Sequence, residues 1–291
     1  MRDDFCVFIL THGRPNDVHT YQTLQSHGYT GKVFIVIDDE DATGDEYKRN
    51  FQDVLIFSKD EVARYTDQYD NSLERRGVLW ARNVCWKLAK EQGYRYFIQL
   101  DDDYVYWGYK RFGKGHRNSS TQLKEYHKWH MKNALSTILE AFIRLLETTP
   151  VQTIAFAQGG DYIGGEPRRT RFKRKAMNSF VCDTEKPFLF RGRLNDDVNT
   201  YVALGRTGDL FFTDMVVLLD QMRTGTNAGG MSEVYQKSGT YAKSFFTVMA
   251  SPSSVTIYEL DNKTNGGQKR LHHKINWSKT VPLIIPEGLK K

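Results

Sequence analysis

Cysteine is scarce in this sequence and widely spaced. Its three cysteines, Cys6, Cys85 and Cys182, each stand among apolar residues. Zinc sites and disulfide frameworks need cysteines in closely spaced groups or in even sets, so neither is expected here. The sequence therefore predicts buried, reduced thiols of a cytosolic protein, with catalysis by one of the cysteines as the alternative.

Long hydrophobic runs are also missing. No segment approaches the roughly 18 consecutive apolar residues that a transmembrane helix needs. The first four residues include Arg2, Asp3 and Asp4 and lead directly into a strand-like stretch, so no secretory signal is expected. We therefore expect a cytoplasmic protein with no membrane partner.

Acids are missing from one strongly basic stretch. The net charge is only +6, but six cations stand in eight residues without an acid between them: Arg168, Arg169, Arg171, Lys173, Arg174 and Lys175. A second basic stretch, residues 110–132, is interleaved with aromatic residues. Cations neutralise phosphates and aromatic rings stack on exposed bases, so both stretches favour contact with nucleic acid. The alternative is a solvated charge run beside core aromatics.

Strand-like and helical patterns alternate through the first hundred residues. Strands are expected at 5–11, 32–37, 53–58 and 94–100, and helices at 17–27 and 72–93. Such alternation is typical of βαβ units. No repeat or interdomain linker interrupts the chain. The sequence therefore predicts one α/β domain with a Rossmann-like, mixed, mostly parallel central sheet flanked by helices.

The second half has a less regular pattern. Helices are expected at 130–147, 195–204 and 232–249, and strands at 153–157, 209–219 and 254–259. Residues 179–182 and 188–191 are expected to form paired strands. Glycines interrupt residues 104–129, which predicts a loop or insertion there. The basic tail from 263 to 277 is expected to be irregular.

The stretch from Tyr96 to Tyr104 combines a buried strand with three acids. Large apolar residues end at Asp101, Asp102 and Asp103. Asp101 and Asp103 point to the same side of an extended backbone, where two like charges are costly unless they share a cation. Their oxygen ligands indicate a hard divalent metal. The alternative is an acidic turn that caps the next element.

Other polar residues follow the remaining expected strands. Thr11 to Arg14 follow the first strand, Asp38 and Asp39 the second, and Lys59 the third. Because the carboxyl ends of parallel strands meet at one edge, a single site can draw on all of them. Arg14 and Lys59 suit phosphate, and Asp38 or Asp39 suits a ribose hydroxyl or a base. Each group alone also fits a solvated loop.

Two arginines lie seven residues apart in the helix expected before the acidic strand. Arg75 and Arg82 would share a helix face, and Arg82 stands among apolar residues that should be buried. A buried arginine needs a carboxylate or a phosphate as its partner. Both partners remain open at this point.

These motifs together resemble a known family. A first strand ending in Thr11-His-Gly-Arg14, a helix with Ala81-Arg82-Asn83 and a strand ending in Asp101-Asp102-Asp103 resemble the GT-A glycosyltransferases. Residues 191–198 and 232–235 make the chain similar to the TET-associated glycosyltransferases of DNA-hypermodifying phages. The resemblance covers residues 5 to about 258.

The resemblance implies a donor and a metal. A divalent cation, Mn²⁺ or Mg²⁺, would bind Asp103 with support from Asp101 and, by the position of a late histidine, His272 or His273. A nucleotide-sugar, expected to be a UDP-sugar, would meet Thr11, Arg14, Asp38, Asp39, Arg75, Arg82, Asp101 and Asp102. The donor half would end at about residue 103, and the acceptor half would follow.

The resemblance also implies an acceptor and a base. Sugar would pass to a hydroxymethylated pyrimidine in DNA, held by the basic run of residues 168–175, in a host cytoplasm if a phage encodes the protein. In an inverting reaction Asp197 would act as base, with Asp196 orienting the sugar or capping the helix; capping alone is the alternative for the pair. Other readings are a nucleotidyltransferase, a transferase acting on protein or glycan, and a non-catalytic DNA-binding protein.

Overall fold

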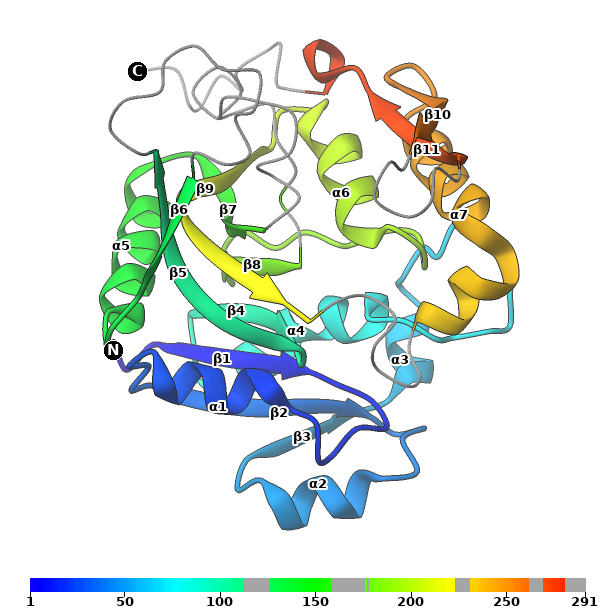
Figure 1. The fold of residues 1–291 in the computed structure, drawn as a ribbon. Coiled ribbons are helices and arrows are strands. Elements are labelled where there is room, and N and C mark those ends of the chain that lie inside the picture. The colour runs from blue at the N-terminus through cyan, green and yellow to red at the C-terminus, as the bar shows by residue number, and fades with distance from the viewer. Residues whose placement is uncertain (113–125, 159–175, 177, 223–230, 262–268, 281–291) are drawn as a thin grey trace.

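The computed structural model describes residues 1–112, 126–158, 176, 178–222, 231–261 and 269–280. Its strands form one large sheet, with helices on both faces, and a small second sheet (Figure 1). The elements are, in chain order, β1 (Phe5–Leu10), α1 (His19–Ser26), β2 (Lys32–Asp38), α2 (Gly44–Asn50), β3 (Val54–Phe57), α3 (Lys59–Ala63), α4 (Leu79–Glu91), β4 (Tyr96–Asp101), β5 (Tyr104–Phe112), β6 (Tyr126–His130), α5 (Leu135–Thr148), β7 (Val151–Ala157), β8 (Ser179–Asp183), α6 (Asp196–Gly205), β9 (Leu210–Gln221), α7 (Met231–Ala250), β10 (Val255–Asp261), β11 (Lys269–Ile275) and a short 3₁₀ helix (Trp277–Lys279).

The large sheet has nine strands in the order β3-β2-β1-β4-β8-β7-β9-β5-β6. The first four are parallel, as their alternation with helices predicts. From β4 onward the pairings are antiparallel except that of β7 with β9. The prediction of a mixed central sheet flanked by helices is confirmed, with the parallel strands concentrated in the first half of the chain.

Alternating residues of β1 belong to the two hydrophobic cores, one on each face of the sheet. Val7 and Ile9 face α1 and α5, whereas Phe8 and Leu10 face α4 and α6. Successive side chains of a strand point to opposite faces, so a continuously apolar strand requires cover on both sides. This explains why the first strand reads as an unbroken hydrophobic run.

Three secondary-structure predictions are wrong. Residues 104–112 and 126–130 form the antiparallel pair β5–β6, and residues 269–275 form β11, which pairs with β10 beside α7. Residues 188–191 are not a strand. Charged residues and glycine hide the strand character of these segments. Gly108 is needed because a Cβ there would lie 2.8 Å from the Trp129 carbonyl oxygen.

The predicted helix at 72–93 begins later than expected, at Leu79. The three cysteines are buried free thiols, as predicted. In the described part of the chain, no helix is long and apolar enough to cross a membrane.

Candidate active site at the carboxyl edge of the parallel strands

The carboxyl ends of β1, β2 and β4 meet at one edge of the sheet. The register pairs Leu10 with Asp101 on one side and with Val36 on the other. Thr11 and Arg14 therefore follow β1 directly beside the three acids that end β4. The convergence expected from a parallel sheet is present, and it brings Thr11, Arg14 and Asp102 into contact.

Asp102 is the acid that ties these loops together. Thr11 Oγ1 donates a hydrogen bond to Asp102 Oδ2 at 2.6 Å, and Arg14 Nη2 lies 3.1 Å from the same oxygen. Tyr47 joins them, because its hydroxyl lies 2.8 Å from Thr11 Oγ1 and accepts the Arg14 backbone N–H. Arg14 Nε is buried and has no hydrogen-bond partner among the described residues.

Thr20 holds the backbone of the acidic turn. Its hydroxyl donates to the Asp101 carbonyl at 2.6 Å and accepts the Tyr104 N–H at 2.9 Å. Its own N–H donates to the Asp102 carbonyl at 3.0 Å. Thr20, on α1, thus holds the backbone of the acidic turn at three points.

The two carboxylate oxygens of Asp103 differ in their hydrogen bonding. Gln221, at the end of β9, donates to Asp103 Oδ2 at 3.1 Å. Oδ1 is buried and has no hydrogen-bond partner in the described structure. Buried polar atoms are almost always paired, so this oxygen is a candidate ligand atom.

Arg82 lies between two carboxylates from distant parts of the chain. Its Nη2 donates to Asp101 Oδ1 at 3.0 Å, and its Nε lies 2.9 Å from Asp196 Oδ2. The second pair is close but not aligned as a hydrogen bond. The guanidinium also lies over the rings of Phe180 and Phe190, at 5.1 and 5.5 Å from their centroids. The partner of the buried arginine is therefore a pair of carboxylates.

Asp197 lies beside this pair at the start of α6. Its Oδ1 accepts the Val198 N–H at 2.7 Å, whereas Oδ2 has no hydrogen-bond partner in the described part of the chain. The Asp197 carboxylate also contributes to raising the pKa of Arg82, whose burial alone would lower it. Asp197 therefore has one helix-bound oxygen and one available oxygen.

Burial favours the protonated form of these acids. Burial raises the pKa of Asp101 to about 7 against the opposing effect of Arg82, and neighbouring acids raise it further. Burial raises the pKa of Asp196 to about 6 and that of Asp102 to about 6, although Arg82 and Arg14 respectively lower them. Burial also raises the pKa of Asp103. Loss of hydration on burial is the largest cause of all four shifts, and neighbouring acids add to it for Asp101, Asp102 and Asp196.

The acids after β2 have different surroundings. Asp38 Oδ1 forms an ion pair with Lys59 Nζ at 2.9 Å, and Asp38 Oδ2 lies 2.8 Å from His12 Nδ1. Burial would raise the pKa of Asp38, but these two partners hold it below its ordinary value. Asp39 Oδ1 accepts the Lys59 backbone N–H at 3.0 Å. Lys59, which suited phosphate by sequence, is thus buried on a carboxylate.

The described contacts of Arg75 and His272 are with residues other than the acids of β4. Arg75 pairs with Glu40 and Asp60. His272 lies on β11, where its ring packs beside Tyr258 and His273. No group of three His, Cys, Asp or Glu side chains within the described ranges is arranged to hold a metal by itself. The six cations between Arg168 and Lys175 lie outside the described residues.

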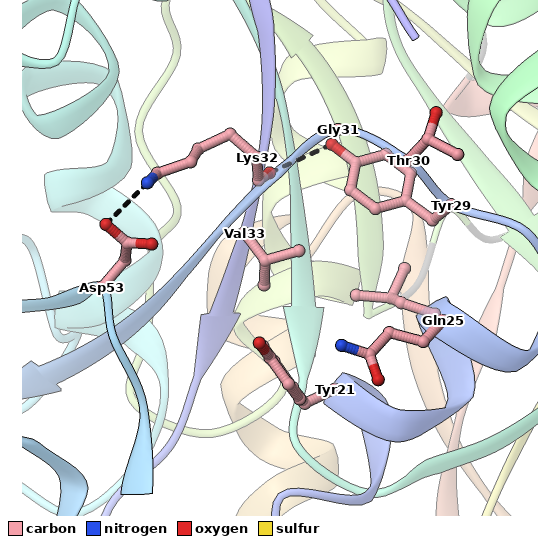
Figure 2. Close-up of a pocket in the computed structure, with 9 residues that line it drawn as sticks. Tyr21, Gln25, Tyr29, Thr30, Gly31, Lys32, Val33 and Asp53 are labelled. Carbon is pink, nitrogen blue, oxygen red and sulfur yellow. Dashed lines mark hydrogen bonds and ion pairs between the residues drawn. The ribbon is translucent and has the colours of Figure 1, made fainter. Parts of the chain in front are cut away.

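A pocket of about 250 Å³ lies at the opposite edge of the sheet (Figure 2). Tyr29, Lys32 and Asp53 line it, and Lys32 Nζ pairs with Asp53 Oδ1 at 2.6 Å. These residues stand at the amino ends of β2 and β3, away from the acids. In open α/β sheets, ligands bind beyond the carboxyl ends of the strands, so this pocket is not the candidate active site.

Sequence reasoning missed three contributors to the site: Thr20, Tyr47 and Gln221. None of them belongs to a recognisable motif. Thr20 and Gln221 reach the acidic turn from 81 or more positions away along the chain. Only the fold reveals them.

Three solved structures resemble the fold at low identity. One is described as a mycobacterial protein, with 9% identity, a TM-score of 0.47, and coverage of 94% of this chain and 84% of that chain. Another is glucosyl-3-phosphoglycerate synthase of M. tuberculosis, with 10% identity, a TM-score of 0.46, and coverage of 88% and 85%. The same enzyme in complex with Mn²⁺, UDP-glucose and phosphoglyceric acid gives 11%, 0.45, and coverage of 97% and 88%.

A comparison with protein families gives a clearer result. No curated protein matches the sequence. The model of the TET-associated glycosyltransferases matches residues 5–230, which include the acidic turn, Arg82 and both acids of α6. Because this match spans most of the chain, the protein belongs to the TET-associated glycosyltransferase family and is a glycosyltransferase, as its motifs predict.

Proposed function

We propose that the protein transfers a sugar from a nucleotide-sugar to a hydroxymethylated pyrimidine base in DNA, with the help of Mn²⁺ or Mg²⁺. The observation that carries the proposal is the buried, unpaired Asp103 Oδ1, which belongs to a group of five acids at the carboxyl edge. The five are Asp101, Asp102, Asp103, Asp196 and Asp197. Membership of a glycosyltransferase family supports sugar transfer as the reaction at this edge.

The acids at this edge fit a divalent metal. Among the described residues, Arg14 forms an ion pair with Asp102, and Arg82 forms ion pairs with Asp101 and Asp196. Five acids thus share two directly paired arginines. A metal that bridges protein and diphosphate needs only one or two carboxylates, because phosphate oxygens and water complete its shell. Asp103 Oδ1 would bind it directly, with Asp101 in support. This fit needs no ligand from His272.

The donor would lie along the ends of β1 and β2. Arg14 has a buried, unpartnered Nε beside Asp102, and a diphosphate oxygen would satisfy it. Asp38 and Asp39, at the end of β2, would face the nucleoside. Thr11 would act by holding Asp102, and Arg75 would close the nucleoside end through its pair with Glu40.

The reaction requires a leaving group and a base. A bound cation supplies positive charge to the departing nucleoside diphosphate. Asp197 Oδ2 would take the proton of the acceptor hydroxyl as that oxygen forms its bond to the anomeric carbon and the bond to diphosphate breaks. Asp196, held on Arg82, would not be the base.

The DNA acceptor is supported by charge and by the family. The protein carries a net charge of +6, and its most basic stretch runs from residue 168 to 175. Neutralising the six cations of this stretch should weaken DNA binding and flatten its salt dependence. Fluorescence anisotropy over a salt series would measure both; an unchanged slope would place the DNA elsewhere.

The function itself can be tested by mass spectrometry. Hydroxymethylated DNA would be incubated with Mn²⁺ and each of a panel of nucleotide-sugars, and unmodified DNA would serve as control. A hexose-sized mass gain on hydroxymethylated DNA with one donor, together with release of the nucleoside diphosphate, is the expected result. Release of pyrophosphate would instead indicate nucleotidyl transfer, and a mass gain only on protein or glycan would contradict the DNA acceptor.

A further inference from the structure

Arg82 is the only described cation that contacts acids of both halves of the proposed active site. It lies on α4, close to Asp101 at the end of β4 and to Asp196 at the start of α6. Asp101 belongs to the donor side and Asp196 stands next to the proposed base. The guanidinium therefore sets the separation between the two sides.

The surroundings of Arg82 leave it little freedom. The residue is 1% exposed and packs against the rings of Phe180 and Phe190. Its neighbour Asn83 donates to the Phe190 carbonyl at 3.0 Å and accepts the Phe190 N–H at 2.8 Å. The segment that leads to α6 is thus fixed to the same helix that carries Arg82.

The start of α6 is anchored from its other side as well. Asn195 precedes the helix with a φ of 56°, a left-handed conformation that costs energy in a residue with a side chain. Its amide donates to the Lys243 carbonyl and to Thr247 Oγ1, both at 3.0 Å. Asn195 and Arg82 therefore hold the two acids of α6 between α7 and α4.

We propose that Arg82 is a positioning residue for the transfer step: by holding Asp196, it directs Asp197 toward the acceptor hydroxyl. The proposal rests on the proposed role of Asp197 as base. Arginine is required because its planar guanidinium presents Nε to one carboxylate and Nη2 to another, whereas a lysine carries a single nitrogen. Lysine at this position would keep the charge and lose the two-sided geometry.

A purely structural ion pair would behave differently. Breaking a buried pair by removing one partner destabilises the whole protein and lowers every activity together. A positioning role predicts a selective loss, because small displacements of a catalytic group slow the chemical step more than they weaken binding. The two roles are separated by the effect of Arg82→Lys on kcat and on donor binding.

The experiment compares Arg82→Lys, Asp196→Asn and the double variant. Turnover on hydroxymethylated DNA should fall about a hundredfold in Arg82→Lys, while calorimetry with UDP and Mn²⁺ should show binding close to wild type. The double variant should be no slower than the slower single variant, because both changes remove one interaction. Additive losses, or an equal loss of UDP binding, would overturn the proposal.

A matched control and a second readout complete the test. Arg95→Lys alters another Arg–Asp pair, with Asp183, away from the site, and should leave turnover unchanged. Amide hydrogen exchange at residues 197–200 should quicken in Arg82→Lys and in Asp196→Asn, with or without substrate. Unchanged exchange in both variants would overturn the proposal, whatever the acceptor. A wild type that transferred no sugar to DNA would by itself contradict only the proposed function. If Arg82→Lys does not fold, Asp196→Asn tests the same contact from its other side.

Discussion

Two acidic clusters lie at the ends of β2 and β4, the strands on either side of β1, and differ in their surroundings. The β2-end cluster consists of Asp38, Asp39, Glu40 and Asp41, and the β4-end cluster consists of Asp101, Asp102, Asp103, Asp196 and Asp197. In the first, His12, Lys59 and Arg75 supply cations, and the pKa of Asp38 is lowered. In the second, burial dominates and the pKa of Asp101 rises to about 7. A run of aspartates thus indicates a cation site only where the protein's own cations do not already fill it.

The largest expected effect is at Asp103. Asp103→Asn keeps the shape and the acceptor for Gln221 but removes the charge and the free Oδ1 of the β4-end cluster. We expect turnover to fall at least about a thousandfold, since a metal supplies several kcal/mol of charge stabilisation. Steady-state assays with Mn²⁺ titration would measure it. Asp53→Asn, at the opposite edge of the sheet, is the control, and normal turnover of Asp103→Asn without added metal would remove the metal role.

The next effect is at Asp197. Asp197→Asn preserves the bond to the Val198 N–H but cannot accept a proton. Removing a general base typically slows a reaction about 10²- to 10⁴-fold, so kcat should fall in this range while UDP–Mn²⁺ binding stays near wild type. Single-turnover kinetics with calorimetry would show the separation. An active Asp197→Asn variant would move the base elsewhere or indicate retention of configuration.

Metal should stabilise the β4-end cluster most at high pH. Between about pH 4 and 7, a carboxyl whose pKa is raised by folding is protonated in the folded protein and ionised in the unfolded one. Without metal, the free energy of unfolding therefore falls as the pH rises through this window. Mn²⁺ compensates the ionised acids. We expect it to raise Tm by several degrees at pH 8 and by much less at pH 5.5. Thermal scans of wild type and Asp103→Asn would test this; equal shifts in both proteins would contradict it.

The smallest effect belongs to the β2-end cluster. The hydrogen bond from His12 to Asp38 raises the pKa of His12 against the effect of burial. This contribution is complete below the unfolded pKa of histidine, about 6.5, and is lost as pH rises through the folded pKa. Because His12 is half exposed, His12→Ala should cost less than about 1 kcal/mol at pH 6 and almost nothing at pH 9. Urea unfolding at both pH values would measure it.

The sequence predicted the donor side of the site better than the acceptor side. Parallel strands bring Thr11, Arg14 and Asp102 together by a general rule. Alternation along the strand does not extend to Asp103, because β4 ends at Asp101 and residues 102–103 form a turn. The partner of Arg82 stayed open between a carboxylate and a phosphate, because Asp196 reaches it from a helix more than a hundred residues later. Such contacts depend on tertiary folding and leave no local pattern.

Strands rich in charged and aromatic residues limited the prediction of the fold in the same way. β5, β6 and β11 carry charged and aromatic residues, and their strand character comes from pairing with β9 and β10. Strand propensity reflects the neighbours of a residue as much as the residue itself. The buried strands β1, β2 and β4, covered on both faces, were readable from the sequence alone.

The position of Arg82 also bears on how the chain folds during synthesis. Arg82 and Asp101 leave the ribosome well before Asp196, and β4 acquires its second neighbour, β8, only when residues 179–183 emerge. Until then the nascent amino-terminal half has an open sheet edge and an arginine with only one of its two carboxylates. We expect a fragment that ends near residue 103 to be insoluble, and the nascent chain to depend on chaperones until α6 docks.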